Sequence, residues 1–120
     1  NRWIAPPANM LLPLVAQQVR RLGYFKAVVT TPFSGSTNYR LDTRLILLQQ
    51  EFMQPTSKVR LVLQASLINN NTNRIIASRR FQVSVKASGN NPYSGVMAAN
   101  QAAAIVTTRM ARFVVRTLTR

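Results

Sequence analysis

Two segments of alternating apolar and polar residues, Val59–Ile68 and Ile75–Val85, flank the turn-forming sequence NNNTN. A period of two is typical of a β-strand with one buried face. Asparagine tolerates positive φ, so the sequence between them is suited to a tight turn. The pattern therefore predicts an antiparallel hairpin. The residues expected on its inner face are Val59, Leu61, Leu63, Ala65, Leu67, Phe81, Val83 and Val85.

The segment Tyr39–Gln49 also alternates and predicts a third long strand. We expect Tyr39, Leu41, Thr43, Leu45 and Leu47 to point one way; past Arg44 both faces become apolar. A shorter apolar run, Ala27–Thr31, predicts one further strand.

Helical spacing marks both ends of the sequence. The residues Leu11–Leu22 predict a helix with Asn9 as N-cap and Gly23 just beyond its end. A longer helix is predicted over Tyr93–Thr117. The apolar stripe expected on the first helix is Leu12, Val15, Val19 and Leu22. That on the second is Ala99, Ala102, Val106, Met110, Phe113 and Val114.

The order of these elements is α-β-β-β-β-α. It predicts an α+β fold, a two-layer sandwich with an antiparallel-rich sheet and the two main helices packed on one face. We expect a single domain over residues 1–120 and, because the sequence starts at Asn rather than Met, an N-terminally incomplete chain.

The composition excludes most catalytic designs. The sequence has no histidine and no cysteine, and its only acids are Asp42 and Glu51. Neither a Ser-His-Asp set nor a thiolate or imidazole metal site can be assembled from such residues. Two acids separated in this way are expected to be surface ion-pair partners of nearby arginines. We therefore predict neither an enzyme nor a bound metal or cofactor.

The formal charge of +14 favours a negatively charged partner: an acidic protein face, anionic lipid or nucleic acid. The densest cluster, Arg109, Arg112 and Arg116, has spacings that keep it on one side of the long helix. Arg20 and Arg21 form a second cluster in the last turn of the first helix, where cations also suit the helix dipole. We predict that these five arginines form a partner-binding basic face. A solvated basic surface without a partner remains an alternative.

Other residues are expected to be structural. Trp3 and Pro7 belong to a Trp-x-x-Pro-Pro sequence ahead of the first helix, and Trp3 is expected to pack against the start of that helix. Contact of an exposed Trp3 with a partner is the alternative. Gly23, Phe81, Met110 and Phe113 complete the structural set.

Five ordered segments resemble the ABC-type transport auxiliary lipoproteins, the family of the paraquat-inducible lipoprotein C group. Together they cover nearly all of the chain. They are RWIAPPANML, LGYFKAVV, NYRLDTRLILLQQEF, VRLVLQASLINNNTNRIIASRRFQVSV and GVMAANQAAAIVTTRMARFV.

The resemblance implies a non-catalytic periplasmic domain, anchored to the outer membrane of a Gram-negative bacterium by an N-terminal lipid that this chain lacks. It also implies that one or two strands that precede the Trp in the family are missing from this chain. It further implies that the domain acts as a protein-interaction module, with a lipid-binding MCE-type protein and an ABC transporter as partners. These proteins are expected to form a multimeric assembly. Anionic lipid is a further possible partner. Two alternatives stay open: a structural lipoprotein of an envelope-spanning secretion complex, and a basic nucleic-acid-binding protein.

Overall fold

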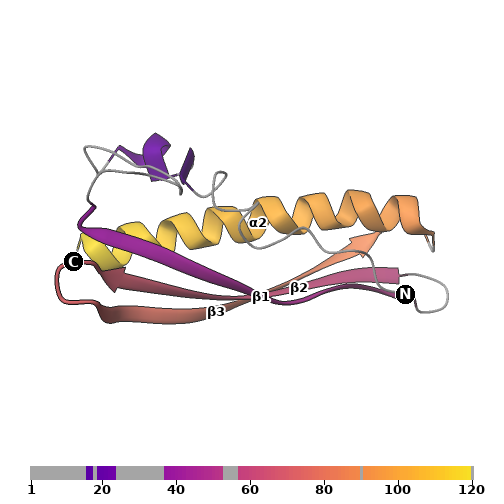
Figure 1. Cartoon of the computed structure of the whole chain (residues 1–120). Helices are drawn as coiled ribbons and strands as arrows, with labels where there is room; N and C mark the ends of the chain where they lie inside the picture. Colours follow the sequence, from indigo (N-terminus) through magenta and orange to yellow (C-terminus); the bar gives the residue numbers. More distant parts are fainter. Residues whose placement is uncertain (1–15, 18, 24–36, 53–56, 90, 120) are drawn as a thin grey trace.

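The computed structural model describes residues 16–17, 19–23, 37–52, 57–89 and 91–119. Three long strands and one long helix make up most of this part (Figure 1). They are β1 (Tyr39–Phe52), β2 (Ser57–Asn69), β3 (Arg74–Ala87) and α2 (Pro92–Leu118). Residues 16–17 and 19–22 are helical as well. The predicted strand Ala27–Thr31 lies outside the described residues, as do Trp3 and Pro7.

The strands form an antiparallel sheet in the order β1-β2-β3. The predicted hairpin connects β2 and β3. In its turn, Asn69 Oδ1 accepts hydrogen bonds from the amides of Asn71 and Thr72, and Asn73 takes a φ of 58°. The structure thus confirms the turn, for the reason the sequence suggests: asparagine satisfies nearby backbone donors and tolerates the left-handed region.

A β-bulge in β1 explains why both faces of that strand are apolar past Arg44. Leu45 pairs with Leu63 and Leu47 pairs with Val62, so Ile46 is the extra residue. A bulge shifts the alternation by one position. Leu48, paired with the inward-facing Leu61, is consequently buried, and the prediction that Leu47 faces inward is wrong.

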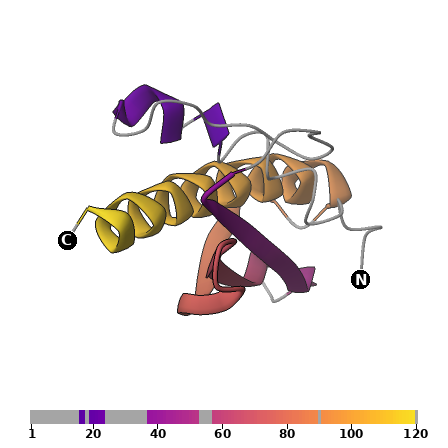
Figure 2. The same cartoon turned by 60° about the vertical axis from the view of Figure 1, so that its left-hand side comes forward.

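One face of the sheet is covered by α2 (Figure 2). The helix contributes Ala102, Val106 and Met110, all fully buried, to the same core as the inner faces of β2 and β3. The ring of Phe113 meets that of Phe81 edge to face, with 5.9 Å between the centroids. The predicted packing of the long helix and the inner face of the hairpin are therefore confirmed.

The short helix at residues 16–22 lies on the same side of the sheet as α2, over the C-terminal half of α2 in both views (Figures 1 and 2). Ala16 and Val19 are buried, but Leu22 is 44% exposed, so the predicted stripe does not extend to the end of this helix. Gly23 has a φ of 72°, the left-handed conformation that commonly ends helices. The α+β fold with helices on one side of an antiparallel sheet is confirmed.

A small buried polar network joins the sheet to the start of α2. Gln50 Nε2 donates to Ser57 Oγ and to the carbonyl of Asn91, at 3.1 and 3.0 Å. The hydroxyls of Ser57 and Ser94 both donate to the carbonyl of Gly89. Because Gln50 lies beyond the bulge, its inward orientation depends on the extra residue in β1.

Candidate interaction surface

Both acidic side chains of the chain lie on the sheet face that α2 does not cover. Asp42 pairs in register with Ser66, and Glu51 with Lys58, which belong to the outward set of β2. Asp42 contacts Arg40 at 3.6 Å; Glu51 contacts Arg60 at 3.1 Å and Lys58 at 3.7 Å. The interpretation of these acids as ion-pair partners is confirmed.

Hydrogen bonding keeps Glu51 charged. The amide of Gln49 donates to its Oε2 at 2.8 Å, and Arg60 Nη1 donates to the same atom. The Gln49 hydrogen bond is the larger cause, followed by Arg60, and together they hold the pKa of Glu51 below its ordinary value. The carboxylate of Glu51 therefore interacts with Gln49, Arg60 and Lys58 on its own face of the sheet.

The helix side of the molecule is basic and has no acidic side chain. Arg109, Arg112 and Arg116 are exposed on α2. Arg79 of β3 joins them, because its guanidinium lies over the Phe113 ring at 5.2 Å from the centroid. Arg109 Nη1 donates to the backbone carbonyl of Gln82 at 3.3 Å, which connects the helix to β3.

An open cavity of about 380 Å³ lies within this basic region. Its lining residues are Arg79, Phe113, Arg116, Thr117 and Thr119. The aromatic ring supplies an apolar floor, and two guanidinium groups supply charge. Such a lining suits the side chain of an acidic residue better than a neutral group.

The predicted site residues therefore fall into three groups. Arg109, Arg112 and Arg116 share the exposed flank of α2, and Arg79 is an addition that sequence reasoning missed. Arg20 and Arg21 are exposed on the short helix. Of the predicted structural set, Phe81, Met110 and Phe113 are buried in the core.

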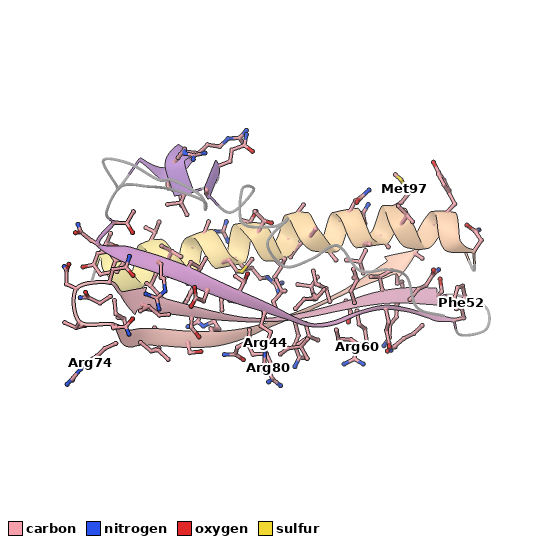
Figure 3. All side chains as sticks on the ribbon, in the orientation of Figure 1. Arg44, Phe52, Arg60, Arg74, Arg80 and Met97 are labelled. Atoms are coloured by element: carbon pink, nitrogen blue, oxygen red, sulfur yellow. The ribbon has the colours of Figure 1, made fainter. Side chains whose placement is uncertain are left out.

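Sequence reasoning also missed a second basic surface, on the outer face of the sheet. Arg44 and Arg80 flank Gln64 across three strands, and Arg80 Nε donates to Gln64 Oε1 at 3.4 Å. Figure 3 shows Arg44, Arg60 and Arg80 on the side of the sheet away from α2. The sequence does place these arginines at outward positions of the alternating segments. Only the register between the strands shows that they lie side by side on one surface.

Within the described residues, no group of three or more acidic, histidine or cysteine side chains could hold a metal ion. None of the described helices combines the length and apolar character needed to cross a bilayer.

The model of one protein family matches residues 1–111: the ABC-type transport auxiliary lipoprotein component. The chain belongs to this family. The resemblance stated from the sequence is thereby confirmed. The family's description, a lipoprotein component of ABC-type transport, points to the cell envelope. No curated protein sequence matches the chain.

Two solved structures share the fold of this auxiliary component. A Xanthomonas campestris protein of the DUF330 family superposes with a TM-score of 0.82 at 24% identity, over 98% of this chain and 66% of that one. A candidate lipoprotein from Caulobacter crescentus superposes with a TM-score of 0.53 at 15% identity, over 98% of this chain and 84% of its own. The chain thus spans just under two thirds of the Xanthomonas protein.

Proposed function

We propose that this chain is the periplasmic domain of an auxiliary subunit for an ABC transporter that works with an MCE-type lipid-binding protein. It is tethered to the outer membrane by an N-terminal lipid and acts as a non-catalytic docking module. Its family supports the transport role. The further step to a docking module is supported by a cavity whose described lining provides arginines and an aromatic ring, without a histidine, cysteine or carboxylate.

The observation that carries the proposal is that both acids lie on the face opposite to Arg109, Arg112 and Arg116. The only acids, Asp42 and Glu51, lie on the outer face of the sheet and are engaged there. No acidic side chain is left to pair with Arg109, Arg112 and Arg116. An acidic surface of a transport partner would supply the missing charge and lower the self-repulsion of the domain.

The test is a charge reversal with a matched control. Arg109→Glu, Arg112→Glu and Arg116→Glu are combined in one variant, and Arg44→Glu, Arg80→Glu and Lys86→Glu in the other. Both make the same charge change on exposed residues, on opposite faces. Each is expressed in the native bacterium and purified from membranes together with its transport partners.

We expect the helix-side variant to lose the ABC and MCE subunits and the control to retain them, with melting temperatures close to that of the natural chain. Association should weaken steeply with salt, because the Debye length falls from about 10 Å at 0.1 M to about 3 Å at 1 M. Retention of the partners by the helix-side variant would contradict the proposal. So would recovery of secretion-complex subunits in their place.

A further inference from the structure

The described cations are distributed unevenly along the molecule, which is 51 Å long. One half contains the β2–β3 turn and the C-terminal half of α2, with the short helix over it (Figure 1). We call this the turn half. In the other half, the cations among the described residues are Arg60, Lys58 and Lys86. Every other described arginine lies in the turn half. The turn half therefore has much the higher positive charge.

The end of the turn half also exposes aliphatic side chains. Ile75 is 64% exposed and Ile76 is 43% exposed, directly after the turn. Ile76 is the extra residue of a second irregularity, because Leu67 pairs with Ala77 and Ile68 with Ile75. Tyr39 is exposed at the same end of the sheet, at the start of β1. Apolar exposure here coincides with positive charge, since Arg74 precedes Ile75 in the chain and extends from this end in Figure 3.

Hydrogen bonds fix the shape of this end. Arg40 Nη1 donates to Asn70 Oδ1 at 2.7 Å, and its Nη2 donates to Asn73 Oδ1 at 3.3 Å. Asn70 Nδ2 donates to Thr37 Oγ1 at 2.7 Å. Arg40, which also contacts Asp42, and Ile75 both flank Ile68 in register. They therefore lie at the same level on the two outer strands of the sheet, with β2 between them.

We propose that this hairpin tip, defined by Tyr39, Arg40, Arg74, Ile75 and Ile76, rests on the surface of an anionic lipid bilayer. Arginines pair with anionic headgroups, and exposed aliphatic and tyrosine side chains enter the boundary between headgroups and acyl chains. A projecting turn of this kind suits a deformable headgroup layer. The described cavity lies elsewhere, on the helix side.

The proposal is independent of the transport partners and is tested without them. The purified chain is mixed with phosphatidylcholine vesicles that contain either no phosphatidylglycerol or about one third of it, and binding is measured by co-sedimentation. We expect binding to the anionic vesicles alone, since each basic residue near an anionic surface adds electrostatic attraction.

Matched variants locate the contact. Ile75→Ser with Ile76→Ser should weaken binding by about tenfold or more, because shallow apolar insertion is lost. Val96→Ser with Met97→Ser removes two comparably exposed apolar side chains from α2, and should leave binding within about twofold. Arg74→Gln should weaken binding by about fivefold and Lys86→Gln by less than about twofold, since these cations lie near opposite ends of β3.

A spectroscopic measurement avoids any dependence on loss of function. The chain has no cysteine, so Ile75→Cys creates a unique labelling site for an environment-sensitive dye. Anionic vesicles should shift its emission to the blue, and the dye on Val96→Cys should not respond. Equal losses from the two apolar pairs, equal dye responses, or no binding of the natural chain to anionic vesicles would each overturn the proposal.

Discussion

Met110 and Met97 occupy opposite environments on the same helix. Met110 is fully buried against the sheet, whereas Met97 is 49% exposed and points away from the sheet in Figure 3. The side chains are chemically identical, so the difference in their tolerance to substitution depends on burial.

Met110→Asp should abolish folding. It places an unpaired charge in a core where the described residues offer no ion-pair partner, and such a charge costs more than a small domain can tolerate. Met97→Asp should change the free energy of unfolding by less than about 0.5 kcal/mol. Circular dichroism and urea titration of both variants check this. A folded Met110→Asp protein would show that this face is open to solvent.

Thr107 has a buried hydroxyl with no hydrogen-bond partner among the described residues. Its neighbour Thr108 donates to the carbonyl of Ala104 at 3.1 Å. Thr107→Val keeps the shape and removes the unsatisfied group, so we expect stabilisation by about 1 kcal/mol. Thr108→Val serves as the control and should give no such gain. Destabilisation by Thr107→Val in a thermal melt would mean that the hydroxyl is hydrogen-bonded in solution.

At the scale of elements, the start of α2 depends on Asn91. Its backbone is extended, and its side chain accepts a hydrogen bond from the amide of Ser94 at 2.9 Å. The carbonyl of the same residue accepts from buried Gln50, so the cap also joins the helix to β1. One residue therefore both begins the helix and positions it on the sheet.

Asn91→Ala should lower the free energy of unfolding by about 1 kcal/mol, the usual effect of losing an asparagine cap. Asn100→Ala, at an exposed position within the helix, should be neutral or slightly stabilising because alanine has the higher helix propensity. Chemical denaturation of the two variants makes the comparison. An equal effect at both positions would exclude a specific capping role for Asn91.

At the scale of the whole molecule, few groups titrate below neutral pH. The chain has two acidic side chains and no histidine. Acid unfolding normally follows the protonation of carboxylates that are engaged in the native state. Here Glu51 is the carboxylate whose pKa folding lowers, through Gln49 and Arg60.

The sign of the resulting pH dependence follows from that direction. A lowered folded pKa stabilises the native state fully above the unfolded value, and this contribution disappears as the pH falls through the folded pKa. Stability should therefore be flat from neutral pH down to about the ordinary glutamate value of 4.5 and decline only below it. Urea midpoints measured across this range check the profile. Glu51→Gln should remove most of the decline, and an unchanged slope in that variant would assign it to another group.

The sequence by itself determined the local structure of this protein. Period-two alternation specified the faces of β2 and β3, because every second side chain of a strand points to the same face of the sheet, and the apolar face is the one that is buried. Asparagines specified the turn, since they satisfy and tolerate its backbone. The missing histidines and cysteines limited the chemistry, and the ordered segments identified the family.

Tertiary structure decided what depends on pairing between distant segments. The bulge at Ile46 reversed the inward set of β1, because its position is set by register against β2; the two apolar faces past Arg44 do not by themselves specify which residue is the extra one. Arg79 joined the helix-side arginines because Phe113 packs beneath it, and α2 comes to that position only through the core. The separation of acids from those arginines has the same origin: which side of a sheet is left to water is fixed only when a helix covers the other.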